Sequence, residues 1–155
     1  MRMRRSKFRY KACSAYTGAM RFLLALLLVP FVASAQPVPA ADAQAVRKVI
    51  EAQLDAFSKD DAERAFSYAT PAIQKMFGSP DGFMAMVRNQ YAVVYRPHAV
   101  TFRSPRRIGT DLVQPVRMTD QAGKPWLVVY PMEQQPDGSW RINGCEIGRL
   151  PGEET

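Results

Sequence analysis

The sequence is poor in the residues that build metal sites and covalent catalytic centres. Among 155 residues it has two cysteines, Cys13 and Cys145, and a single histidine, His98. Zinc and iron sites usually draw on several Cys or His ligands. The sequence also lacks the Walker loop, the dinucleotide fingerprint and the G-x-S-x-G and H-E-x-x-H motifs. We therefore expect no cofactor, no metal and no nucleophilic hydrolase chemistry.

Negative charge is absent from the first 35 residues, which hold seven of the 21 Lys and Arg residues. Residues 36–155 hold fourteen charges of each sign and are formally neutral, although the whole chain carries a net charge of +7. A basic excess usually suggests an anionic partner, but here it lies in one terminal segment. We therefore expect no nucleic-acid partner.

A hydrophobic run long enough to cross a bilayer is also missing. The apolar run Phe22–Val32 follows basic residues and ends at Ala33-Ser34-Ala35, which is typical of a secretory signal peptide. From Phe22 to Ala35 this segment has only fourteen residues, whereas a membrane-spanning helix needs about twenty. We predict a signal peptide over residues 1–35, cleavage after Ala35, and a periplasmic or secreted protein without a stable membrane span.

Such a cleavage would leave Cys145 as the only cysteine, so no disulfide could form within the chain. Its place in an apolar segment favours a small buried hydrophobic side chain. A reactive thiol or an intermolecular bridge is the alternative.

The first half of the mature chain is predicted to be helical after a short tether, residues 36–44. Apolar residues from Val46 to Phe57 recur at spacings of four, four and three, which predicts a helix from about Asp42 to Ser58. Asp60 is placed to cap a second helix, and Glu63 follows three residues later as in a capping box.

Two more helices are expected before the pattern changes. One covers Pro71–Phe77 and ends at Gly78, and the next is opened by Ser79-Pro80 and runs through Val87. Segments rich in β-branched and aromatic residues then predict consecutive antiparallel strands, with turns at 120–123 and 136–138. These strands are expected at 91–95, 99–103, 112–118, 125–132 and 139–147. Helices followed by a meandering sheet predict a single α+β domain over residues 45–150.

The residues over about 45–148 also resemble a known family. The matching residues are Gln53, Ala56, Phe57, Asp60, Asp61, Ala65, Phe66, Ala69, Pro71, Ile73, Gln74, Phe77, Gly78, Phe83, Met86, Val87, Tyr91, Val94-Tyr95-Arg96-Pro97, Gln114, Trp126, Tyr130 and Asp137-Gly138-Ser139-Trp140-Arg141-Ile142 through Cys145. They resemble an uncharacterised family of exported bacterial proteins, the domain of unknown function numbered 4864. The resemblance implies a nuclear-transport-factor-like, or cystatin-like, cone of helices on a curved antiparallel sheet. That family has no established activity, so the resemblance implies a fold and no reaction.

Enzymes of the cone fold use carboxylates inside an apolar pocket for proton transfer. Glu133, Glu146 and His98 are the candidate proton carriers here, and each is more often a solvated side chain. Asp60 and Asp61 are better explained by capping than by catalysis.

Arginines supply two further candidate sites. Arg96 follows Tyr95 and could hold an anion through its planar guanidinium, although a structural ion pair to Asp60 or Asp61 is favoured. The basic run Arg103, Arg106 and Arg107 is expected to be a solvated loop, because three charges without interleaved aromatic residues are weak evidence for an anion site.

We expect an exported, non-catalytic module that binds a small amphipathic ligand or an envelope protein through the concave sheet. The alternative is a small lyase or isomerase that uses the same pocket. The expected pocket-lining residues are Tyr95, Arg96, Gln114, Trp126, Tyr130 and Trp140, and core packing is the competing interpretation of the aromatic ones.

Overall fold

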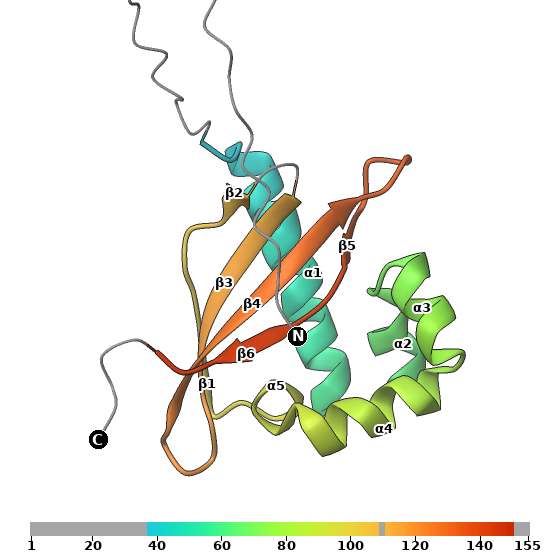
Figure 1. The fold of residues 1–155 in the computed structure, drawn as a ribbon, viewed down its shortest axis with the longest axis vertical. Coiled ribbons are helices and arrows are strands. Elements are labelled where there is room, and N and C mark those ends of the chain that lie inside the picture. The colour runs from blue at the N-terminus through green and yellow to red at the C-terminus, as the bar shows by residue number, and fades with distance from the viewer. Residues whose placement is uncertain (1–36, 109–110, 151–155) are drawn as a thin grey trace, which may run out of the picture. The chain divides into compact units, whose positions relative to one another are not determined.

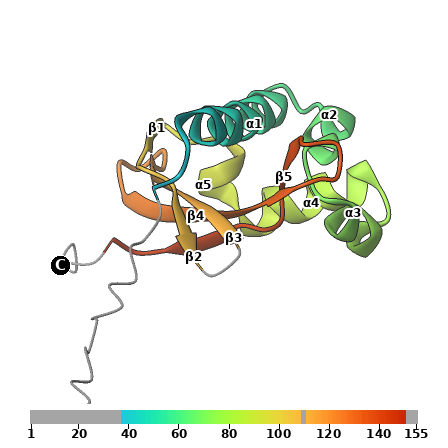
Figure 2. The same ribbon diagram turned by 90° about the horizontal axis from the view of Figure 1, so that it is seen from above.

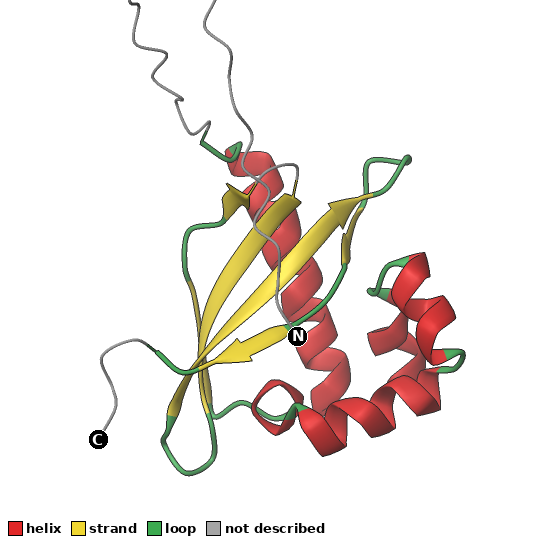
Figure 3. Ribbon diagram, in the orientation of Figure 1, coloured by secondary structure: helices red, strands yellow, loops and turns green. Residues whose placement is uncertain are grey.

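The computed structural model describes residues 37–108 and 111–150, and the predicted signal peptide, residues 1–35, lies outside them. Within these described residues, five helices precede six strands (Figures 1 and 3), which confirms the α+β class. The helices are α1 (Ala40–Ser58), α2 (Ala62–Ser67), α3 (Pro71–Phe77), α4 (Pro80–Gln90) and α5 (Ala92–Tyr95). The strands are β1 (Ala99–Phe102), β2 (Arg106–Ile108), β3 (Asp111–Thr119), β4 (Pro125–Gln134), β5 (Trp140–Ile142) and β6 (Glu146–Gly148).

Local capping explains where the short helices begin and end. Thr70 accepts a hydrogen bond from the backbone N–H of Ile73, and Ser79 accepts one from that of Gly82, which satisfies otherwise unpaired donors of the first turn. A proline stands at the first position of both α3 and α4. Gly78 ends α3 with φ +70°, a conformation that favours glycine. The predicted bounds of α3 and the predicted start of α4 are confirmed.

The predicted cap of α2 is wrong by one residue. Asp61, not Asp60, accepts the hydrogen bond from the backbone N–H of Arg64, at 3.0 Å. Asp60 instead takes φ +58° in the turn after α1, a conformation that Asp and Asn tolerate better than most residues. The side chain of Asp60 is thereby free for contacts with other helices.

The predicted strand at residues 91–95 is wrong, because this segment forms α5. The backbone N–H groups of Val94 and Tyr95 donate to the carbonyl of Tyr91, as in a helical turn. Val93 and Val94 are adjacent in the chain and both are buried. In a strand with one face exposed, neighbouring side chains would instead alternate between buried and exposed positions. Packing beside α4 and α1 therefore overrides the β propensity of valine and tyrosine.

The strands form one antiparallel sheet, which is strongly curled (Figure 1). β3 and β4 are the long central pair, β1 and β2 both pair with β3, and β5 and β6 both pair with β4. Strand β2 was expected to be a loop, and the single predicted strand 139–147 is divided into β5 and β6. α1 lies along one face of the sheet, and α2, α3 and α4 gather beyond β5 (Figure 2).

Two prolines in the central strands explain why both outer rows are interrupted. β1 ends opposite Val116 and β2 begins opposite Val113, so the first break faces Pro115. β5 ends opposite Met132 and β6 begins opposite Val129, so the second break faces Pro131. Pairing between β3 and β4 continues through both prolines, so the positions where their N–H groups are missing face outward. A proline cannot donate to the neighbouring strand, and each outer strand leaves the sheet there.

The core lies between α1 and the inner face of the sheet. Val46, Ile50 and Phe57 of α1 are fully buried, as are Val116 of β3 and Val128 of β4. Burial of such side chains contributes roughly 1.5 to 3 kcal/mol each. At the end beyond β5, the Phe83 ring packs against the rings of three other phenylalanines, Phe57, Phe66 and Phe77. Among the residues described, no helix has the length and apolar character that crossing a membrane needs.

Candidate functional site

A cavity of about 550 Å³ opens where β5 and β6 separate. Its walls come from α1, α3, α4, α5 and β4 and from the segment Ile142–Glu146. Most of the lining is apolar, with aromatic and aliphatic side chains such as Phe57, Ile73, Phe77 and Val87. A concave apolar site with a few polar groups is the usual form of a small-molecule pocket.

Tyr130 of β4 is the most unusual member of this lining. The residue is 1% exposed, and among the described residues its hydroxyl has no hydrogen-bond partner. Burial raises the pKa of Tyr130 well above its usual value, and the neighbouring Cys145 adds to that rise. The Cys145 thiol, a weak hydrogen-bonding group, is close enough to act on the hydroxyl. A buried polar group of this kind lacks the partner that nearly all such groups have.

Cys145 lies beside Tyr130 in the gap between β5 and β6. Burial raises the pKa of its thiol to about 12, so the thiol is protonated at neutral pH and is a poor nucleophile. This agrees with the interpretation of Cys145 as a small apolar side chain. The thiol is a weak donor and acceptor, which leaves the Tyr130 hydroxyl unsatisfied.

Other polar residues of the lining have structural partners or lie at its edge. Gln53 is buried, and its Nε2 donates to the Ala65 carbonyl at 3.0 Å, joining α1 to α2. The Oδ1 of Asn143 accepts a hydrogen bond from the Thr70 hydroxyl at 3.0 Å. Glu146 is exposed and is the charged residue of the lining.

Of the six residues expected to line a pocket, Tyr130 lies in this cavity, and the described lining does not include the other five. Trp140 is buried in the core. The Nε1 of Trp126 donates to an oxygen of Asp120 at 2.9 Å, and Lys124 lies over its ring. The hydrogen bond from Trp126 is the main cause that lowers the pKa of Asp120.

Tyr95 and Arg96 belong to an ion-pair cluster around Asp60, which joins α4 and the end of α5 to the turn after α1. Arg88 lies 2.7 Å from one carboxylate oxygen of Asp60, and Arg96 lies 3.0 Å from the other. The Tyr95 hydroxyl donates to the same carboxylate, and both guanidinium groups lie over its ring. The hydrogen bond from Tyr95, followed by that from Arg88, lowers the pKa of Asp60. The expectation that Arg96 forms a structural ion pair is confirmed, with Asp60 as the partner.

Gln114 lies at a second, more polar hollow of about 530 Å³ between the start of α1 and the segment that joins β1 to β2. Its Nε2 donates to the backbone carbonyls of Arg103 and Pro115. This hollow lies at the break opposite Pro115, and the larger cavity lies at the break opposite Pro131. Both hollows therefore lie where an outer strand is interrupted.

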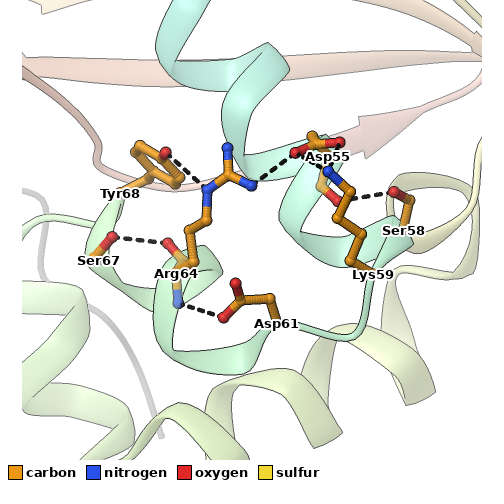
Figure 4. Close-up of polar contacts among 7 residues, drawn as sticks. All are labelled: Asp55, Ser58, Lys59, Asp61, Arg64, Ser67 and Tyr68. Carbon is orange, nitrogen blue, oxygen red and sulfur yellow. Dashed lines mark hydrogen bonds and ion pairs between the residues drawn. The ribbon is translucent and has the colours of Figure 1, made fainter.

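A second polar cluster fixes α2 against the end of α1 (Figure 4). Arg64 donates from Nη1 to Asp55 at 2.7 Å and from Nε to the Tyr68 hydroxyl at 3.4 Å. Lys59 lies 2.9 Å from the same Asp55 carboxylate. The pKa of Asp55 is lowered, first by the hydrogen bond from Lys59 and then by that from Arg64. These groups are half-exposed and are explained by helix packing.

The candidate proton carriers are separated from one another. His98 and Glu133 are exposed and do not belong to the described lining of the cavity, whereas Glu146 does. The Oε1 of Glu133 accepts a hydrogen bond from Gln135. In the described part of the chain, His, Cys, Asp and Glu side chains do not gather in groups of three or more that could hold a metal ion.

The residues of α3 and α4 that line the cavity were not predicted, because their apolar side chains have the spacing of ordinary core residues. The strand break at Asn143–Cys145 had one usable signal, which was the proline at position 131 in the neighbouring strand.

Fold and cavity together define an α+β domain with helices packed on a curled antiparallel sheet and an apolar pocket between them. The chain belongs to the family described as domain of unknown function DUF4864, whose model matches residues 39–155. No curated protein matches the chain.

Proposed function

We propose that this domain is a non-catalytic module that binds a small amphipathic molecule in the cavity between its helices and β4. The observation that supports this most is the Tyr130 hydroxyl, which is buried in the cavity wall and finds no partner among the described residues. A bound molecule with one hydrogen-bonding group would satisfy that hydroxyl, and the apolar lining would bury the remainder of the molecule. Export to the periplasm or outside the cell, with cleavage after Ala35, is part of this proposal.

The test uses Nile red, a neutral dye that fluoresces in apolar surroundings. We expect saturable binding with one site per chain. Replacing Tyr130 with phenylalanine keeps the ring and removes the hydroxyl, so it should weaken binding of a ligand that hydrogen-bonds there. Native mass spectrometry of the protein purified from its own source should show an added small mass in the wild type.

Tyr68→Phe is the matched control, since it also removes one hydroxyl but lies outside the described cavity lining. Its binding should equal that of the wild type. A protein that shows neither saturable dye binding nor an added mass would contradict the proposed function.

Catalysis by a small lyase or isomerase remains the alternative, and Glu146 is its one proton carrier at the cavity. The alternative lacks a second group, since His98 and Glu133 lie outside the described lining. Proton transfer in such sites is usually carried by a carboxylate with a perturbed environment and a fixed partner. The exposed side chain of Glu146 therefore supports binding better than catalysis.

A further inference from the structure

The cavity lining carries formal charge of one sign only, which is negative. Among its described residues there is no Lys, Arg or His, and Glu146 carries the only formal charge. A site built to hold a carboxylate or phosphate normally supplies an arginine, a lysine or several backbone N–H groups. The cavity has none of these cationic side chains, although 21 Lys and Arg residues occur in the chain.

The charge of Glu146 also acts on Cys145, its neighbour in the lining. Its carboxylate contributes to the raised pKa of the Cys145 thiol, and Cys145 in turn acts on the Tyr130 hydroxyl. A negative group placed next to Tyr130 would meet desolvation, and one placed near Cys145 would also meet the charge of Glu146; each disfavours an anion. A neutral hydroxyl or carbonyl at the same place would have a much smaller desolvation cost and no charge repulsion.

The two ends of the cavity thus offer a ligand different kinds of interaction. The Tyr130 hydroxyl is buried in the wall and would give one uncharged hydrogen bond to a ligand group that reached it, whereas Glu146 is exposed and offers a negative charge. The wall between them is mostly apolar. A ligand that fits this order has an uncharged polar group or an amine attached to an apolar body.

We propose, on the basis of the proposed function, that the cavity selects uncharged or cationic amphiphiles and rejects anionic ones. Long-chain alcohols and amines bind, and fatty acids of the same length bind more weakly. Glu146 is the residue that sets this charge preference, and Tyr130 supplies the hydrogen bond to the neutral group.

The experiment is displacement of Nile red at pH 7.5 by three ligands of equal chain length: decan-1-ol, decylamine and decanoate. Decan-1-ol is kept below its solubility limit, and the other two are kept below their micellar concentrations. We expect decanol and decylamine to displace the dye, and decanoate to require a concentration at least about tenfold higher. The variant Glu146→Gln should bind decanoate more tightly and decylamine more weakly, with decanol unchanged. Glu133→Gln is the matched control because Glu133 is an exposed carboxylate outside the described lining, and it should leave all three affinities unchanged.

Failure of this inference can be told apart from failure of the proposed function. Decanoate that binds as tightly as decanol, with binding still weakened in Tyr130→Phe, would overturn the charge preference and leave a binding module. A ranking that Glu146→Gln does not alter would likewise remove Glu146 from its role. If Nile red and all three ligands fail to bind, the binding function itself is overturned, and the charge preference with it.

Discussion

Tyr130 places a polar hydroxyl inside the cavity wall without a partner among the described residues. A buried unsatisfied polar group costs about 1 to 3 kcal/mol. We therefore expect the ligand-free variant Tyr130→Phe to be as stable as the wild type, or more stable by up to about 1 kcal/mol. Urea unfolding of both proteins after removal of bound small molecules measures this difference. A clear loss of stability would mean that the hydroxyl has a structural partner, and would weaken the case for a ligand.

The Asp60 cluster predicts a defined response to acid. Hydrogen bonds from Tyr95 and Arg88 lower the folded-state pKa of Asp60 below its unfolded value, so ionised Asp60 stabilises the fold above the unfolded pKa near 4. This stabilisation is lost as the pH falls through the lower, folded-state pKa. The variant Asp60→Asn should melt at a lower temperature than the wild type at pH 7, and the difference should shrink as the pH falls toward 2.

Asparagine is the suitable replacement because it also tolerates the positive φ of this turn, so the backbone is not an added variable. The groups around Asp60 are half-exposed, and the effect at pH 7 should be small for that reason. A difference in melting temperature that stays constant from pH 7 to pH 2 would show that the charge of Asp60 is not the cause.

At the scale of elements, α3 depends on the glycine that ends it. Gly78 has φ +70°, and a Cβ built there would meet no atom within 4 Å. The cost of Gly78→Ala is therefore conformational and should be about 1 kcal/mol. Gly148→Ala is the control, since Gly148 also has open space around it but no positive φ, and it should cost less. Equal melting temperatures for the two variants would contradict this account.

The sequence predicted the elements whose signals are local. α1 was predicted from its apolar period, α3 from Pro71 and Gly78, and the central strands from alternation. The segment 91–95 was misassigned because its valines and tyrosines favour a strand in isolation, and only packing beside α4 makes them helical. The cap of α2 was misplaced because adjacent aspartates give the same sequence signal, and the turn geometry alone distinguishes Asp60 from Asp61.

The candidate site was less predictable than the fold. Alternation along β4 placed Tyr130 on the inner face, which the structure bears out, since Tyr130 is buried. The two-residue alternation of the strand did not distinguish Tyr130 from Trp126, which shares that face but lies against Asp120. The cavity also needs α3 to meet the segment after β5, through the contact of Thr70 with Asn143. The local sequence does not indicate that two residues 73 positions apart will be in contact.

At the scale of the whole molecule, export is the prediction to test first. The apolar run and the small residues at 33–35 predict a mature protein that begins at Gln36. Mass-spectrometric mapping of the N-terminus, on protein from the periplasmic or extracellular fraction, checks this. Retention of residues 20–35, with the protein in the membrane fraction, would contradict it.

The interrupted outer strands have a consequence for how copies of this chain meet each other. A strand at the edge of a sheet offers unpaired N–H and C=O groups to which another chain can add. Here each edge is cut into pieces of three or four residues, because the inner strands carry Pro115 and Pro131. Pieces of this length are poor templates for strand addition. We therefore expect the same prolines that accompany the two hollows to disfavour edge-to-edge aggregation of the folded protein.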